Sequence, residues 1–416
     1  MGAGNDAWVL IAAALVLFMT PGLALFYGGM VRSKNVLATM MLSFACMGAV
    51  TVLWAVVAFS LAFGPDVGHG LIGSLRFAGL AGMGHGLPGF RHLAVSPMAV
   101  MVFQMMFAII TAALISGGTV DRVRFTSFIV LIVAWLFVVY VPLAHWVFSP
   151  GGWLARRGVL DFAGGTVVEI NSGFSTLAVV LVIGRRRGWP GEAMTPHSVP
   201  LSLLGAGILW FGWFGFNAGS ALGANDLAVT AFVNTQLAAA AGLLGWMAFE
   251  RWKEHSPTTL GAASGAVAGM VAITPAAGFV APMAALGIGV VAGIVCAMAV
   301  RLKFRWRYDD SLDVLGVHGV GGLVGMVAIG LVATRSVDPG GANGLLTGGG
   351  WHLLAVQALA AAVAAAWAFG ATWLLAKGVD ALLGLRVSPE DEARGLDITQ
   401  HAESAYSIGG SGRPGG

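Results

Sequence analysis

Charged side chains are scarce in this sequence: Asp, Glu, Lys and Arg together make up 10% of its 416 residues. Water-soluble domains carry about 25%, so this chain has too few charges to cover a soluble surface. Cysteine is nearly absent, and because Cys46 and Cys296 both lie inside apolar runs they predict neither a disulfide framework nor a CxxC motif. No Lys or Arg precedes Arg32. The first apolar run therefore lacks the basic start of a secretory signal, and we expect it to be a retained helix.

Hydrophobic residues, in contrast, make up 57% of the chain and gather in long runs. A helix needs about 20 apolar residues to cross a bilayer, and a spanning segment must pair every backbone group internally. The sequence therefore predicts an all-α polytopic membrane protein with eleven transmembrane helices. We place them at 8–31, 36–63, 98–118, 125–148, 162–184, 199–221, 227–249, 259–275, 281–300, 312–333 and 351–377.

Basic residues alternate between the two sides of this array. Of the 22 Lys and Arg residues, seventeen follow odd-numbered spans and five follow even-numbered spans. Because basic residues concentrate on the cytoplasmic side, we expect the N-terminus outside and the C-terminus inside. The basic clusters thus have a topological explanation and do not indicate nucleic-acid binding. The expected organisation is a membrane domain over residues 1–377 and a cytoplasmic tail over residues 378–416.

Glycine is abundant, with 62 residues, and much of it lies within the expected spans. Gly215 and Gly219 share a small-residue spacing that is repeated at Gly261–Gly265–Gly269 and Gly289–Gly293. Such spacing lets membrane helices approach closely. We interpret most of these glycines as packing residues.

The odd number of spans is compatible with two inverted five-helix halves plus one extra helix. The fifth span of each half would then begin with an aspartate, Asp161 or Asp313, and carry one ionisable residue, Glu169 or His318. Ionisable residues inside a membrane usually face a cavity or a partner, so we expect Glu169 and His318 to meet near the midplane. Two structural alternatives remain: a simple hydrogen-bonded pair for Glu169 and His318, and helix capping for both aspartates.

Several long motifs, in the same order, resemble the ammonium transporter/methylammonium permease/Rhesus family, and its ammonium transporter branch in particular. They are the opening TPGLALFYGGM with KNVL, the segments DFAGGTVV with EIN and DVLGVHGV, the stretch WFGWFGFNAGS, and the tail GLDITQHAESAY. The similarity runs from about residue 8 to residue 407. Several long motifs in register are a more specific signal than any single short one.

The resemblance implies a homotrimer with one pore per subunit, which recruits NH₄⁺, deprotonates it and conducts NH₃ beside a separate proton path. The matching positions are Phe107 and Phe216 for the outer gate, Phe107, Phe148, Ser220 and Asp161 for substrate recruitment, and Glu169, His318 and Trp213 for the pore and proton path. Three positions depart from the family pattern. Glu169 stands in place of the usual first pore histidine, Phe148 in place of a tryptophan, and Ala402 in place of a tail glycine.

The chemistry of these residue types agrees with that assignment. An aromatic cup attracts a cation with about 0.5–2 kcal/mol per ring, and the hydroxyl of Ser220 adds an acceptor. An apolar lining beyond the cup would penalise any cation, and K⁺ has no proton to lose. Because Asp161 and Glu169 are eight residues apart, about 12 Å along a helix, water would have to bridge them. Glu169 and His318 would titrate as one coupled unit.

Other functions receive less support. The sequence contains no HExxH motif and no GxSxG elbow, so we expect neither an enzyme nor a bound metal or cofactor. The alternative function is an ammonium sensor that signals through its tail, and a Rhesus-type gas channel is the nearest alternative within the family. The expected partners are ammonium or methylammonium, the lipid bilayer and, by resemblance, a PII signal protein at the cytoplasmic face. The expected location is the cell inner (plasma) membrane.

Overall fold

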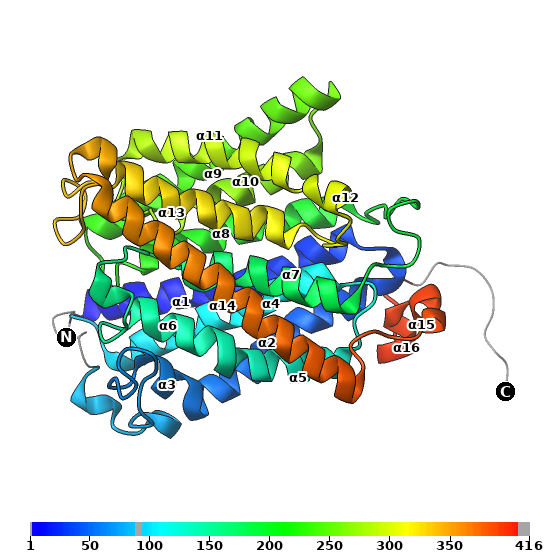
Figure 1. Ribbon diagram of the computed structural model, residues 1–416, viewed down its shortest axis with the longest axis horizontal. Helices are drawn as coiled ribbons and strands as arrows, with labels where there is room; N and C mark the ends of the chain where they lie inside the picture. The colour runs from blue at the N-terminus through cyan, green and yellow to red at the C-terminus, as the bar shows by residue number, and fades with distance from the viewer. Residues whose placement is uncertain (1, 88–93, 407–416) are drawn as a thin grey trace.

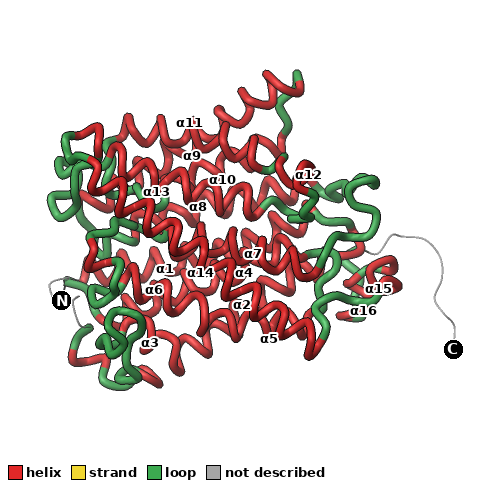
Figure 2. Tube along the Cα trace, in the orientation of Figure 1, coloured by secondary structure: helices red, strands yellow, loops and turns green. Residues whose placement is uncertain are grey.

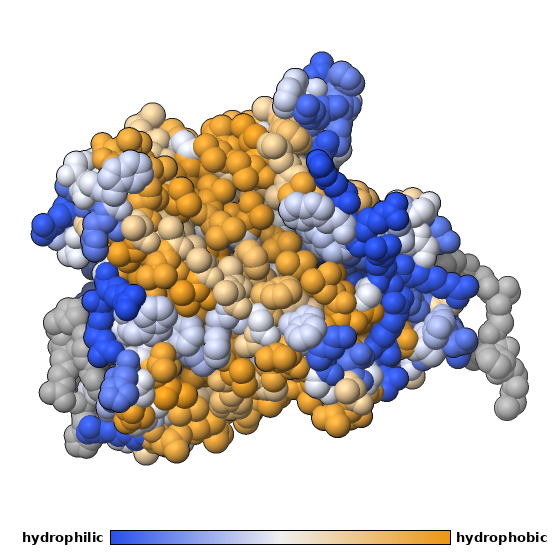
Figure 3. All heavy atoms as spheres, viewed as in Figure 1, coloured by the Kyte–Doolittle hydropathy of each residue, from blue (hydrophilic) through white to orange (hydrophobic). Residues whose placement is uncertain are grey.

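The computed structural model describes residues 2–87 and 94–406 and is built from α-helices that run side by side (Figure 1). Loops gather at the two ends of this helix bundle (Figure 2), and no strand occurs in either described range. On the face shown in Figure 3, apolar residues form a broad belt around the middle of the bundle, and polar residues cover both ends. This is the distribution expected of a protein that crosses a bilayer.

The helices have the following bounds in chain order. They are α1 (Ala3–Met30), α2 (Val36–Leu53), α3 (Phe59–Phe63), α4 (Pro97–Thr119), α5 (Phe125–Trp135), α6 (Val141–Phe148), α7 (Asn171–Ile183), α8 (Val199–Gly219), α9 (Asp226–Glu254), α10 (Thr259–Ile273), α11 (Pro282–Ala299), α12 (Leu302–Trp306), α13 (Val320–Val332), α14 (Trp351–Leu383), α15 (Pro389–Arg394) and α16 (Leu396–His401). Four π-helical segments join or open these helices, at Trp54–Ala58, Leu136–Tyr140, Gly165–Ile170 and Leu315–Gly319.

Within the described ranges, ten of these segments are long and apolar enough to cross a membrane. The eighth expected span is the exception, because α10 has 15 residues, about 22 Å of helix against a hydrocarbon core of about 30 Å. Turns over residues 274–280 continue the chain from the end of α10 to α11. The last span is longer than expected, since α14 continues to Leu383.

Close packing at glycines is confirmed where α1 lies along α8. A Cβ on Gly215 would lie 2.6 Å from Cβ of Leu15, and a Cβ on Gly212 would lie 2.2 Å from Cγ of Met19. Neither separation is compatible with an ordinary van der Waals contact. Any larger residue would therefore push the first helix of one expected half away from the first helix of the other.

The fifth and tenth spans share an unusual start. Each opens with a π-helical segment, Gly165–Ile170 before α7 and Leu315–Gly319 before α13. The two spans cross closely where α7 meets the second of these segments, because a Cβ on Gly173 would lie 2.4 Å from Cα of Gly319. The wider π-helical turn and the glycine crossing bring the ionisable residues of the two halves together.

The described part of the tail folds back onto loops of the same subunit. Asp397 accepts a hydrogen bond from the backbone N–H of Ala38 at 2.8 Å, and Asn35 accepts one from the N–H of Leu396 at 2.8 Å. Gln400 accepts a hydrogen bond from the N–H of Phe125, the first residue of α5, and donates one to the carbonyl of Val123 in the preceding loop. Residues 378–406 are thus an ordered part of the fold, while the tail residues 407–416 lie outside the described ranges.

Candidate functional site

Two phenylalanines from different helices stack on one another inside the bundle. The rings of Phe107, from α4, and Phe216, from α8, stack with centroids 4.2 Å apart and an angle of 24° between their planes. Both side chains are buried. Trp213, one turn earlier in α8, packs against Phe216 with ring centroids 5.6 Å apart, and its Nε1 donates to Oγ1 of Thr274 at 2.9 Å. The aromatic residues singled out from the sequence therefore form one cluster.

Phe148 and Ser220 lie next to this stacked pair. The Phe148 ring meets Phe107 edge-on, with centroids 6.5 Å apart, and is half-buried. Ser220 follows Phe216 by one helical turn, and its hydroxyl donates to the Phe216 carbonyl at 2.9 Å. Because the hydroxyl proton is used in that bond, the oxygen presents its lone pairs to a ligand. This arrangement can hold a small cation between an acceptor oxygen and aromatic faces.

A narrow cavity lies behind the stacked rings. Its water-accessible volume is about 10 Å³, room for about one water molecule. The lining is mainly apolar and consists of Met19, Leu23, Phe26, Ile110, Leu114, Val168, Glu169, Leu209, Trp213, Phe216, Val267 and His318. Such a lumen penalises an ion that cannot lose its charge.

The two ionisable residues of this cavity form a direct pair. Nδ1 of His318 lies 2.7 Å from Oε2 of Glu169, and both side chains are buried. When Glu169 is ionised, its carboxylate can only accept, so Nδ1 must carry the hydrogen and Nε2 is left free to take a proton. Oε1 of Glu169 has no hydrogen-bond partner among the described residues. The predicted meeting of Glu169 and His318 is confirmed.

Asp161 organises the loop that leads into Glu169. One carboxylate oxygen accepts from the N–H groups of Gly164 and Gly165 at 2.8 and 2.6 Å, and the other accepts from the N–H and the hydroxyl of Thr166 at 2.8 and 2.5 Å. Burial raises the pKa of Asp161, and these hydrogen bonds act in the opposite direction. Capping of the fifth span is therefore confirmed. Phe148 lies beside the same loop, since a Cβ on Gly164 would be 3.5 Å from its Cζ.

The pairing of Asp161 with Asp313 across the two halves was wrong. The structural counterpart of Asp161 is Asp310, whose Oδ2 accepts from the N–H of Leu315 at 2.8 Å, five residues on, as Asp161 does from Thr166. Asp313 instead forms an ion pair with Lys303 at 2.5 Å. The eight-residue spacing could have revealed this, because Asp310 precedes His318 by the same distance as Asp161 precedes Glu169.

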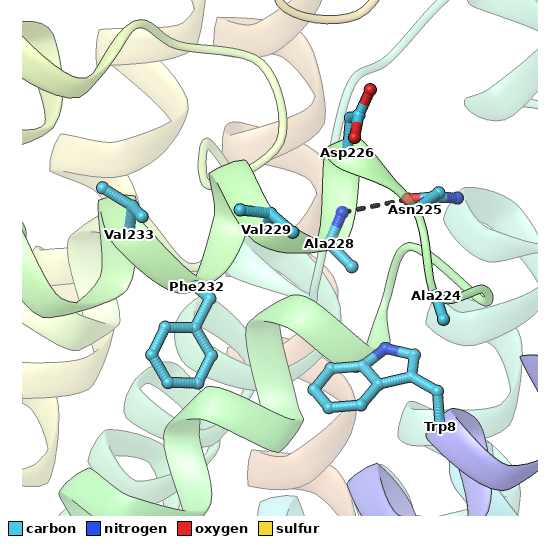
Figure 4. A pocket seen from close by; sticks show the side chains of 8 residues that line it. All are labelled: Trp8, Ala224, Asn225, Asp226, Ala228, Val229, Phe232 and Val233. Carbon is cyan, nitrogen blue, oxygen red and sulfur yellow. Dashed lines mark hydrogen bonds between the residues drawn. The ribbon is translucent and has the colours of Figure 1, made fainter. Parts of the chain in front are cut away.

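A larger hollow of about 450 Å³ lies on the outside of the bundle, between α1 and the start of α9. In Figure 4, Trp8 faces Phe232 and Val229 across it, while the carboxylate of Asp226 points away. Val229 is 63% exposed, so this hollow opens on the outer surface and is distinct from the cavity that contains Glu169 and His318. Asp226 is the only ionisable residue among its described lining residues, and its carboxylate points away from the hollow. We therefore do not place the functional site there.

Sequence reasoning missed Asp310, the hydrogen-bond partner Thr274 and the apolar residues that complete the lumen. Only Asp310 left a signal in the sequence, through its spacing. Thr274 lies in the turn after α10, and Met19 and Ile110 look like ordinary residues of apolar helices. Their roles depend on which helix faces face each other, which periodicity alone does not specify.

Comparison with known proteins gives a consistent result. A sequence model of the Ammonium Transporter Family matches residues 7–406. An ammonium transporter of Mycobacterium tuberculosis is 48% identical over 432 residues, covering 97% of this chain and 90% of the relative. The crystal structure of Candida albicans Mep2 is similar with a TM-score of 0.88 at 35% identity, covering 94% of this chain and 88% of that one. A structure described as a sensor Amt protein has a TM-score of 0.88 at 30% identity, covering 96% and 98%.

Proposed function

The chain belongs to the Ammonium Transporter Family, and from that premise we propose that it recruits NH₄⁺ at its aromatic mouth, deprotonates it and conducts NH₃ through the apolar lumen, with the proton on a separate path. The observation that carries this proposal is the stacked pair Phe107–Phe216, which closes a narrow apolar cavity containing the Glu169–His318 pair. A plain water-filled ion channel would need neither the stacked gate nor the apolar lining.

Recruitment of NH₄⁺ takes place at the aromatic mouth, which consists of Phe107, Phe148 and Ser220. Aromatic faces attract a partly desolvated cation by about 0.5–2 kcal/mol each, and the lone pairs of Ser220 replace part of its hydration shell. Phenylalanine attracts a cation less strongly than tryptophan. We therefore infer that Phe148 makes this outer site weaker than one built with tryptophan.

Deprotonation must precede entry to the lumen, because a charged species is costly in an apolar cavity. Ammonia is neutral and small, so it can pass the stacked rings once they move apart. The proton then needs its own route, and we assign Asp161 and the Glu169–His318 pair to it. Asp161 contributes by placing a fixed negative charge at the entrance to that route, and its charge is close enough to act on Glu169.

We further infer eleven crossings, with α10 and the turns after it as the eighth, the N-terminus outside and the C-terminus inside. The start of α1 and the tail helices α15 and α16 lie at opposite ends of the bundle (Figure 1), which supports an odd number of crossings. We assign residues 1–377 to the membrane domain, residues 378–416 to a cytoplasmic tail, and the protein to the inner (plasma) membrane. A homotrimer with one pore per subunit is the assembly that the family suggests.

Selectivity tests this proposal. Purified protein in proteoliposomes should give a transient current on an ammonium or methylammonium pulse and at most about a hundredth of that current with K⁺ or Na⁺, since a penalty of ~2.7 kcal/mol suffices for a hundredfold difference. Recording on supported membranes at several pH values provides the measurement, with protein-free liposomes as the control. K⁺ currents as large as the ammonium currents would contradict the proposed mechanism.

Sensing is the second candidate function, favoured by two observations: the similarity to the sensor Amt structure and the folded tail. Lys34 donates to the backbone carbonyls of Glu392 and Ala393 at 3.2 and 2.5 Å, so the tail is tied to the loop that follows α1. A change in that loop could thus be passed to a bound partner. Conductance in proteoliposomes would assign transport to the chain, whereas binding of ammonium without conductance would assign sensing.

The tail prediction concerns a PII signal protein. We expect the full chain to retain the host's PII protein in a pull-down, and a variant that ends at Leu383 to lose it, because the ordered surface of residues 384–406 is then missing. Size-exclusion chromatography must show that both proteins keep the same oligomeric state. No binding of PII to the full chain with ATP, with ADP or without nucleotide would refute this docking role.

A further inference from the structure

Asp310 occupies, in the second half of the chain, the place that Asp161 occupies in the first. Each aspartate lies eight residues before the buried ionisable residue of its half, and each holds the N–H of the residue five positions on. The environments differ, however. Each carboxylate oxygen of Asp161 accepts two hydrogen bonds, four in all. In contrast, Oδ1 of Asp310 has no hydrogen-bond partner among the described residues.

This unpartnered oxygen is deeply buried, since Asp310 is 1% exposed. It faces α4, where a Cβ on Gly118 would lie 3.2 Å from it. Thr176 of α7 approaches the same glycine, with its Cγ2 at 2.2 Å from that Cβ position, and Oγ1 of Thr176 is also without a partner in the described ranges. Buried polar atoms in proteins are nearly always hydrogen-bonded. Asp310 and Thr176 thus both approach Gly118, and each carries a buried polar atom that is free to bond a water molecule or an exchanging proton.

The carboxylate of Asp310 has no ion-pair partner of its own in the described part of the chain. Lys303 donates to the backbone carbonyl of Asp310 at 3.2 Å, but its ion pair is with the carboxylate of Asp313. The carboxylate of Asp310 also interacts electrostatically with two tyrosines, Tyr308 of the same loop and Tyr27 of α1. Burial raises the pKa of Asp310 to about 6, with the charge of Asp313 adding to the effect and Lys303 opposing it.

Asp310 also lies between the buried pair and the tail side of the bundle. Tyr27 is within electrostatic range of both Glu169 and Asp310, so the two carboxylates share one buried aromatic neighbour. The neighbours of Asp310 in the chain, Ser311 and Asp313, line a hollow of about 610 Å³ near the end of α1. A proton on Asp310 therefore has the Glu169–His318 pair on one side and the hollow on the other.

We infer that Asp310 is a second proton-exchanging carboxylate, which takes the proton from the Glu169–His318 pair through bridging water and releases it to the tail-side hollow. Water is needed because Asp310 lies eight residues before His318, about 12 Å along a helix. This inference rests on the proposed function, since it needs a proton to have been separated from ammonium. In the step, an O–H bond forms at the Asp310 carboxylate as the pair loses a proton, and that bond breaks when water in the hollow accepts the proton. No other reactant is consumed.

A purely structural role is the competing explanation, because Oδ2 of Asp310 caps the start of the tenth span. The two roles can be separated by chemistry. Asn retains an oxygen that accepts from Leu315 but cannot exchange a proton, whereas Glu retains the exchangeable carboxyl on a longer side chain. Asp313→Asn is the matched control, since it makes the same chemical change three residues away in a side chain paired with Lys303.

The test compares ammonium-evoked currents of the parent, Asp310→Asn, Asp310→Glu and Asp313→Asn in proteoliposomes between pH 5 and pH 8. We expect Asp310→Asn to lower the current at least about tenfold, as for loss of a proton-transfer group, and to remove the pH dependence near pH 6. Asp310→Glu should recover part of both, and Asp313→Asn should keep most of the parent's current with its pH dependence moved to lower pH, because the charge of Asp313 raises the pKa of Asp310. If Asp310→Asn cannot be isolated folded, Thr176→Val removes the other unpartnered atom without touching the cap and should lower the current as well.

Two outcomes would overturn the inference: an Asp310→Asn protein with the parent's current and pH profile, or, where that variant does not fold, a Thr176→Val protein with the parent's current. Failure of the proposed function looks different, because the parent protein itself would then give no ammonium current.

Discussion

Replacing Glu169 by alanine is expected to remove proton-coupled current, with a loss of at least about tenfold, as for other proton-transfer groups. Alanine cannot relay a proton, and it leaves Nδ1 of His318 without the carboxylate that lies 2.7 Å away. His318 would then lose the partner that fixes which ring nitrogen carries the hydrogen. The measurement is the ammonium-evoked current in proteoliposomes between pH 5 and pH 8.

Glu169→His is the informative companion variant. Two neutral histidines carry no charge, whereas the Glu169–His318 pair is negative when His318 is neutral and Glu169 ionised. We therefore expect Glu169→His to stay active, with a shifted pH profile and a smaller leak of cations such as K⁺. The parent pore should tolerate cations better than the histidine variant, because its charge at the midplane is more negative.

Stability must be separated from transport in these variants. Glu169→Gln serves as the matched control, since it keeps the size and a hydrogen-bonding group but cannot exchange a proton. It should fold like the parent and lose current like Glu169→Ala. If Glu169→Ala shows currents and a pH dependence indistinguishable from the parent, Glu169 is a structural partner of His318 and takes no part in proton transfer.

Asp161→Ala should abolish transport altogether. Its carboxylate accepts four hydrogen bonds from residues 164–166, and alanine would leave those donors without a partner at the start of the span that carries Glu169. Loss of a cap alone costs about 0.5–2 kcal/mol, and hydrogen bonds to a charged group are worth about 1.5–3 kcal/mol. The loop beside Phe148 and Glu169 would therefore lose its fixed geometry as well as its negative charge.

Asp161→Asn and Asp161→Glu divide these two contributions. Asn keeps an acceptor oxygen but carries no charge. Glu keeps the charge, but its longer side chain moves the carboxylate away from its hydrogen-bond donors. We therefore expect each variant to retain part of the activity. Transport of labelled methylammonium into proteoliposomes measures it, after size-exclusion chromatography and thermal unfolding have shown that each variant is folded. A well-folded and fully active Asp161→Ala protein would refute the role of Asp161.

The sequence by itself determined the class of the protein and most of its helices. Apolar runs of about 20 residues and a scarcity of charge are local properties, and a bilayer permits few structures other than helices for them. It also identified Glu169 and His318 as a pair, because an ionisable residue in a long apolar run is conspicuous and needs a partner. The aromatic residues were found through resemblance, since a phenylalanine in the lumen and one facing lipid look alike in sequence.

Only the tertiary structure decided the features that depend on contacts between distant segments. It showed that Asp310, and not Asp313, is the structural counterpart of Asp161, because each of the two accepts a hydrogen bond from the N–H five residues on. Asp313 is instead ion-paired with Lys303. It also showed that the fifth and tenth spans open with π-helical segments and approach one another closely at Gly173 and Gly319. Periodicity assigns residues to a helix and to a face, but it does not say which faces meet, and that choice rests on the packing of all the helices together.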